Sequence, residues 1–465
     1  MSFYVLLGCC VILILYLSVL VWGKTRNPAY IFGIFCMYYW SLHGCWTIIA
    51  DNLGKSQETK HQYLYDDLFF VQCNPAYGQT ILYYTIFIVV VQLVVLLTSR
   101  SSRNLFGPPQ PIVLSHGWLL AGAAGCGLLA LLLVRGAIGE AAKSNVSAYV
   151  LSRSEAIPLY SLYSLLNRGA LIPAALGIAI LASGNAARFV VAKRCLGDIA
   201  GYGLLCSVMV GSCIALGNKA EVFMAAISGY LFYMVNTLRP RLVVLHLGLA
   251  LGITGFVLMD VVRAVPLRDL TRDLSWLRGE DLLRAAKSNE VFGAHFSMYG
   301  AIHYEVPLTY GSSVVSFLAS VVPRIFWPER PEGIYVHYAS SLGFNALKAA
   351  GQGYSVHHAT GWYLNFGLIG ILIGASLFAR IWTWLFNLLD RYQSIRDSWT
   401  DVFVRICPWV FTAAIPSLLR SGPEGYKGAI LEAIIVPVVI LGIARMPTAA
   451  TAQPEPTTLR YYPAV

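Results

Sequence analysis

The sequence predicts an all-α polytopic membrane protein, and its composition is the first reason. Of its 465 residues, 57% are apolar and only 12% are charged, whereas a soluble domain carries about 25% charged residues. A soluble fold of this length cannot bury so much apolar surface, so the excess must face lipid. The apolar residues also lie in long segments, and basic residues occur in several of the connections between those segments.

The apolar segments are long enough to cross a bilayer, for which a helix needs roughly 20 apolar residues. They fall at 2–22, 29–50, 78–98, 112–134, 165–183, 199–217, 220–237, 242–262, 361–386, 401–419 and 429–444. The sequence therefore predicts about eleven membrane-spanning helices. No basic stretch precedes the first segment, so we expect it to be an uncleaved helix and not a signal peptide.

The positions of Lys and Arg predict the orientation, because short cytoplasmic connections are enriched in these residues. They occur after the first, third, fifth, seventh and last segments and between the ninth and tenth: Lys24, Arg26, Arg100, Arg103, Arg188, Lys193, Arg194, Arg239, Arg241, Arg380, Arg391, Arg396 and Arg445. This pattern places the N-terminus outside and the C-terminus inside, which requires an odd number of spans.

Four regions follow from these segments: a helical membrane bundle over 1–262, a large external loop region over 263–360, a second bundle over 361–445 and a disordered tail over 446–465. Within the external region, the segment SSVVSFLASVVPRIFW at 312–327 is too short before its proline to span. Counting it as a span would also invert the charge pattern. We expect a re-entrant or interfacial helix there.

Several function classes are excluded by what the sequence lacks. The net charge is +10, but no basic run with interleaved aromatic residues indicates a nucleic-acid partner. The ten cysteines contain no CxxC pair, which argues against a zinc site. A nucleotide-binding glycine loop, HExxH, GxSxG and DxD are all absent, so we expect chemistry without a metal or a cofactor.

Candidate binding residues lie in the external stretch EVPLTYGSSVVSFLASVVPRIFWPERPEG, which contains Glu305, Arg324 and Arg330. Arginine suits bidentate contact with phosphate oxygens, and the prolines around it stiffen the loop. The alternative is an interfacial loop whose arginines reach lipid head groups. His357 and His358 precede the ninth segment on the same side, and histidine readily accepts a proton near neutral pH. A purely structural role for the two histidines stays open.

Further candidates lie at other external helix ends. Lys219 and Glu221 belong to the short turn GNKAE, and a buried carboxylate there must either pair with a cation or line a cavity. Arg168 begins the fifth segment and Arg420 ends the tenth. They would either complete a basic ring around a polyprenyl pyrophosphate or anchor their helices at the interface.

The stretch TYGSSVVSFLASVVPRIFWPERP, followed by a glycine-rich loop and YLNFGLIGILIGA, resembles the oligosaccharide repeat-unit polymerases of the O-antigen polymerase (Wzy) family. The elements PR-x-x-WP-x-x-P and NFG-x-x-G carry most of the resemblance, and the turn GNKAEVF is also family-like. The specific motifs cover about residues 305–375.

This resemblance implies an integral-membrane glycosyltransferase with a fold related to the GT-C group, working on undecaprenyl-pyrophosphate-linked glycans at the periplasmic face of the bacterial inner membrane. Partners would be membrane lipids and a chain-length regulator protein. The related ligases carry a proton-accepting histidine that matches His358 or His357, and their pyrophosphate-binding arginines match Arg324 and Arg420. The chain has Lys219 where an arginine is commoner, and Gly361 near the place where many polymerases have a glutamate.

The expected reaction is polymerisation of lipid-linked repeat units for polysaccharide biosynthesis. A base, His358 or Glu305, takes the acceptor proton, and Arg324, Arg330, Lys219 and Arg420 stabilise the departing pyrophosphate. The alternatives are an O-antigen-type ligase, which uses the same chemistry, and a transporter or flippase for the lipid-linked glycan. Transporters typically have internal repeats and charges near the middle of the membrane. The sequence shows no repeat, and its notable charges gather at one face.

Overall fold

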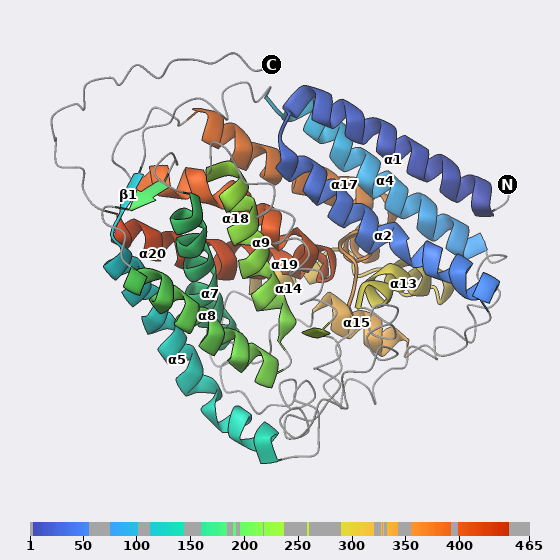
Figure 1. Cartoon of the computed structure of the whole chain (residues 1–465). Coiled ribbons are helices and arrows are strands. Elements are labelled where there is room, and N and C mark those ends of the chain that lie inside the picture. The colour runs from blue at the N-terminus through green and yellow to red at the C-terminus, as the bar shows by residue number, and fades with distance from the viewer. Residues whose placement is uncertain are drawn as a thin grey trace.

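The computed structural model is an all-helical bundle with two short strands (Figure 1). It describes residues 3–54, 75–100, 112–143, 160–183, 189–191, 196–216, 218–236, 258–259, 290–319, 327, 329, 333–342, 355–391 and 399–445.

Helices occupy the described parts of the predicted apolar segments. They are α1 (Phe3–Thr25), α2 (Pro28–Gly54), α4 (Pro75–Thr98), α5 (His116–Lys143), α7 (Tyr160–Ser183), α8 (Leu196–Ala215), α9 (Lys219–Asn236), α17 (His358–Arg391), α18 (Trp399–Leu419) and α20 (Val436–Ala444). Within the described residues, eight helices are long and apolar enough to cross a membrane. The prediction of an all-α polytopic membrane protein is therefore confirmed. The count of about eleven spans stays a prediction, because the segment 242–262 lies almost entirely outside the described residues.

The helices form two groups that meet at α18. Helices α1, α2 and α4 lie side by side with α17, and helices α5, α7, α8 and α9 lie together on the other side (Figure 1). Helix α18 contacts α2 and α17 in the first group and α9 and α20 in the second. Close packing is visible where Gly33 of α2 meets Trp382 of α17, because a Cβ atom at Gly33 would lie 2.3 Å from the indole.

The predicted external region contains a buried helix that the sequence analysis did not separate from its surroundings. Helix α13 (Glu290–His303) packs against α2, α4 and α17, and the whole stretch 294–301 is buried. Two shorter helices follow, α14 (Ser312–Ala319) and α15 (Ile334–Ser341). Helix α14 has 8 residues, which at 1.5 Å per residue is far too short to span a bilayer. The stretches 263–289 and 320–326 lie outside the described residues.

Helix α17 is broken near its N-terminal end. The backbone leaves helical geometry at Phe366 and Gly367, where Gly367 has φ 61 and ψ −144, a combination open mainly to glycine. The amide of Asn365 donates to the carbonyl of Gly361 at 2.7 Å, and the N–H of Thr309 donates to the carbonyl of Leu364 at 2.7 Å. The carbonyls of Gly361 and Leu364 thus accept hydrogen bonds at the break, and a helix broken within a membrane needs such partners.

The two strands lie at the opposite end of the bundle from α13. Strand β1 (Ile112–Leu114) pairs in parallel with β2 (Phe189–Val191), and Leu114 also forms an antiparallel bridge with Arg445. The predicted apolar segment 112–134 therefore begins as a strand, and its helix starts only at His116. This small sheet ties the start of α5 and the end of α20 together.

Candidate functional site

A single segment, residues 420–428, connects two polar clusters in the interior. It follows α18 and contains a short 3-10 turn, η2 (Gly422–Glu424), and one helical turn, α19 (Gly425–Lys427). A π-helix, η3 (Gly428–Ile435), continues from it into α20. Helices with π geometry are rare and occur often at functional sites. We call residues 420–428 the connecting segment.

The first cluster surrounds His357, which is fully buried at the start of α17. Its Nδ1 accepts the N–H of Ala359 at 3.1 Å, as an N-cap side chain does. Because Nδ1 is an acceptor, the ring proton is on Nε2, which donates to the hydroxyl of Ser41 at 3.1 Å. The N–H of His357 itself donates to the hydroxyl of Ser297 at 2.9 Å. Helices α2, α13 and α17 therefore meet at this one residue.

His358 is also fully buried, and both of its ring nitrogens are bonded. Nδ1 donates to the carbonyl of Gly422 at 2.9 Å, which joins α17 to the connecting segment. Nε2 accepts the indole N–H of Trp362 at 3.2 Å. His358 is thus a neutral ring whose lone pair points at Trp362. That lone pair could accept a substrate proton only after the indole has moved away.

Sequence reasoning missed His295, which lies beside His357 in the same cluster. Its Nδ1 donates to the carbonyl of Ser41 at 2.6 Å, and its Nε2 accepts the hydroxyl of Tyr77 at 2.9 Å. Burial lowers the pKa of His295 to about 4, so the ring is uncharged at neutral pH. The available signal was the lack of any Lys, Arg, Asp or Glu between Glu290 and Glu305, which is typical of a buried helix.

Polar side chains also hold the first turns of α17. The hydroxyl of Ser297 donates to that of Thr360 at 2.9 Å, and Tyr84 donates to the carbonyl of His295 at 2.7 Å. Farther along, the Asn365 amide oxygen accepts the hydroxyl of Ser313 at 2.9 Å. The NFG element singled out in the sequence therefore fastens α14 to the break in α17.

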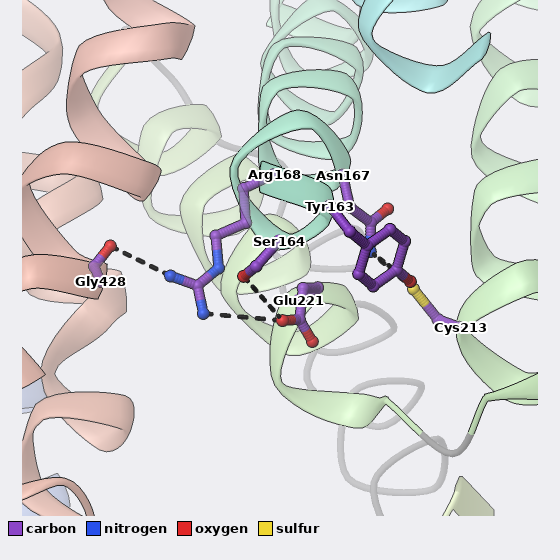
Figure 2. A network of polar contacts seen from close by, with 7 residues as sticks. All are labelled: Tyr163, Ser164, Asn167, Arg168, Cys213, Glu221 and Gly428. Atoms are coloured by element: carbon purple, nitrogen blue, oxygen red, sulfur yellow. Dashed lines mark hydrogen bonds and ion pairs between the residues drawn. The ribbon is translucent and has the colours of Figure 1, made fainter. Parts of the chain in front are cut away.

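The second cluster is an ion pair between α7 and α9 (Figure 2). Arg168 Nη2 lies 3.6 Å from Glu221 Oε1, with both side chains buried. Ser164 donates to the same carboxylate oxygen at 3.3 Å, and Arg168 Nη1 donates to the carbonyl of Gly428 at 3.0 Å. Of the two alternatives left open for Glu221, the structure therefore provides the paired one. Lys219 is buried nearby, at the start of α9.

The connecting segment joins the two clusters directly, because Gly422 accepts from His358 and Gly428 accepts from Arg168. Between them, the carboxylate of Glu424 accepts the N–H of Ile334 at 2.7 Å. A carboxylate is favourable at the N-terminus of a helix, so Glu424 fixes the start of α15. Sequence reasoning did not single out Glu424.

Gly361 lies against the same segment, and a side chain there would collide with it. A Cβ atom at Gly361 would be 2.5 Å from Pro423 Cδ and 3.0 Å from Gly422 Cα. A glutamate cannot occupy this position unless the connecting segment moves. The glycine at position 361 therefore has a packing reason in this chain.

The remaining predicted residues are placed less centrally or not at all. Glu305 is exposed just after α13, with a left-handed φ of 50. Its neighbour Val306 packs in a small apolar cluster with Val356, which puts Glu305 at the same end of the bundle as the histidines. Arg420 is half-buried at the end of α18. Arg324 and Arg330 lie outside the described residues.

The arrangement offers neutral histidines, a buried guanidinium and a carboxylate around the connecting segment. Among the described residues, no group of three or more His, Cys, Asp and Glu side chains could hold a metal ion. Histidine and carboxylate groups can transfer protons, and guanidinium groups can stabilise anions. Comparison of the chain with protein-family models, with curated proteins and with solved structures found no match.

Proposed function

We propose that this protein is a membrane glycosyltransferase that polymerises undecaprenyl-pyrophosphate-linked repeat units at the periplasmic face of the bacterial inner membrane. The observation that carries the proposal is the link through the connecting segment between His358 and Arg168. The histidine cluster contains His358, which can take a proton once Trp362 moves, and the other cluster contains Arg168, a cation held by Glu221 that we assign to the phosphate. The reaction needs both.

In the proposed reaction, the hydroxyl of an incoming repeat unit attacks the anomeric carbon of the growing chain. The base, His358 or Glu305, takes the hydroxyl proton as the new glycosidic bond forms. The bond between that carbon and the pyrophosphate oxygen breaks, and undecaprenyl pyrophosphate leaves with the electron pair. Arg168, Lys219 and Arg420, together with Arg324 and Arg330, supply positive charge for this leaving group.

The decisive experiment incubates purified protein with a lipid-linked repeat unit and no nucleotide sugar. We expect lipid-linked products of graded length, and we expect them to form in excess EDTA because no metal takes part. A single capped product would indicate a ligase. Activity that EDTA abolishes and a divalent ion restores would contradict the metal-independent mechanism.

A flippase for the lipid-linked glycan is the second candidate, because two features are typical of transporters. Helix α17 is discontinuous at Phe366 and Gly367, and an ion pair lies buried between α7 and α9. Discontinuous helices and interior charges frequently line transport pathways. A fluorescent lipid-linked glycan in proteoliposomes distinguishes the two: translocation without chain growth supports the flippase, and chain growth without translocation supports the polymerase.

A further inference from the structure

We infer that His357 is a positioning residue that sets the start of α17, and that Ser41 and His295 act through it. The inference deepens the proposed function and rests on it for the activity measurements alone. It assigns different roles to His357 and His358, although the sequence allows either of them as the base. The geometry around His357 carries the argument.

His357 makes the two hydrogen bonds of a helix N-cap. Its carbonyl accepts the N–H of Gly361 at 2.8 Å, which is the first intrahelical bond of α17. Its side chain accepts the N–H of Ala359 at 3.1 Å. Asn, Asp and Ser are the usual residues in this role. The imidazole of His357 performs the same task as an asparagine side chain but is larger.

The larger ring gives His357 a second contact that an ordinary cap does not have. Its Nε2–H donates to the hydroxyl of Ser41 on α2, and the carbonyl of Ser41 is in turn held by the ring of His295 on α13. Tyr77 on α4 fixes the other nitrogen of His295. The start of α17 is therefore located relative to three other helices through two imidazoles, those of His357 and His295.

Neither nitrogen of His357 is available to a substrate in this arrangement. The Nδ1 lone pair is directed at a backbone N–H within its own helix, and Nε2 carries the proton given to Ser41. The ring has no exposed surface. Because His358 directly follows the cap, any shift of the cap moves the His358 ring relative to Gly422. The effect of His357 on the reaction would be transmitted in this way.

The test compares His357→Ala, His357→Asn and His357→Gln in the full-length protein. Asparagine restores the acceptor for Ala359, glutamine can reach Ser41 but does not restore the cap, and none of the three variants has a titratable group. Two readouts are measured: polymer length at matched protein levels, recorded also as a function of pH, and amide hydrogen exchange in the first turn of α17. The exchange readout does not depend on the proposed function.

We expect His357→Ala to exchange about tenfold faster or more in this turn and to lose polymer by a similar factor, because both a cap and a buried hydrogen bond are lost. His357→Asn should stay within about threefold of the parent in both readouts, with an unchanged pH profile. Ser41→Ala keeps the cap and loses the same contact between α2 and α17, so it should resemble His357→Asn. Ser207→Ala, which removes an exposed hydroxyl bonded only within its own helix, is the matched control and should change neither.

Two results would overturn the inference. If His357→Asn restores slow exchange but makes as little polymer as His357→Ala, His357 takes part in the chemistry itself. If His357→Ala leaves exchange at the start of α17 unchanged, the residue does not set that helix. A parent protein that makes no polymer would refute the proposed function, while the exchange comparison would still decide the role of His357.

Discussion

The guanidinium of Arg168 and the carboxylate of Glu221 lie 3.6 Å apart inside the bundle and join α7 to α9. The same guanidinium donates to the carbonyl of Gly428, the first residue of the π-helix η3. One side chain thus fastens three helices, and it does so at the end of the connecting segment. The pair holds the second cluster in place, and its guanidinium is one of the cations that we propose for the pyrophosphate.

Removing Arg168 should therefore cost stability as well as activity. Arg168→Ala leaves a buried carboxylate without its cation, which costs about 3–5 kcal/mol. Arg168→Lys should also fail, because one ammonium group cannot satisfy both Glu221 and Gly428 with the geometry of a guanidinium. The melting midpoint in detergent measures the loss, and polymer length measures activity.

The double variant Arg168→Met with Glu221→Leu separates the two roles of the pair. Replacing a buried ion pair by apolar residues of similar volume is often neutral for stability. We expect a melting midpoint near that of the parent and no polymer. Polymer of normal length from this double variant would show that Arg168 serves the fold alone.

The orientation in the membrane is a second prediction, derived from the pattern of Lys and Arg residues. Ser340 is exposed on α15, in the region predicted to be external, and Ser394 belongs to a connection predicted to be cytoplasmic. Cysteines introduced at these two positions in a cysteine-free background should react from opposite sides of the membrane. Labelling of both from one side would refute the orientation and the periplasmic site with it.

The membrane helices could be predicted because lipid imposes a simple requirement on sequence. The segment 78–98 became α4 (Pro75–Thr98) with little change, since a span must be apolar throughout its length. Helix α13 was not separated from the external region for the converse reason. It has 14 residues, too few to span, and its burial depends on α2, α4 and α17, which the sequence does not place around it.

The candidate site could be predicted only where a residue type alone demands a partner. The rule that a buried carboxylate needs a cation indicated that Glu221 would be paired or would line a cavity, but not that Arg168 would be the partner. Tyr77 and His295 meet although they are 218 positions apart. The break in α17 likewise depends on Thr309, a residue distant in sequence. The N–H of Thr309 donates a hydrogen bond to the carbonyl of Leu364. Such contacts arise from tertiary packing and leave no local pattern.

Acid should destabilise the protein through His295. Burial lowers the pKa of this residue from 6.5 to about 4, so the folded state binds its proton only at lower pH than the unfolded state does. The stabilisation is complete above pH 6.5, declines as the pH falls, and is lost by about pH 4. A shift of this size corresponds to about 3 kcal/mol. His357 and His43 lie close enough to His295 for positive charges on these rings to repel one another. This repulsion also lowers the pKa of His295.

The melting midpoint in detergent, measured from pH 7.5 to pH 4, checks this prediction. His295→Asn keeps a donor for the carbonyl of Ser41 and cannot titrate in this range, so its midpoint should decline less steeply with acid. His337→Asn on α15 is the control and should follow the parent. Equal slopes for His295→Asn and the parent would show that another group causes the acid sensitivity.

The last prediction concerns the identity of the base, for which His358, Glu305 and the contact with Trp362 make separate tests possible. A general base contributes on the order of 10²–10⁴-fold to the rate, so His358→Ala should abolish long chains. That variant also loses the bond to Gly422. His358→Asn is therefore the sharper probe, because its amide N–H can keep the donor to Gly422 while the proton acceptor is gone.

Trp362→Phe removes the indole N–H that occupies Nε2 of His358 and should leave activity unchanged or raise it. If Glu305 is the base, Glu305→Gln will be inactive and His358→Asn merely slow. Normal polymer from both Glu305→Gln and His358→Asn, at matched protein levels, would show that neither residue takes the proton.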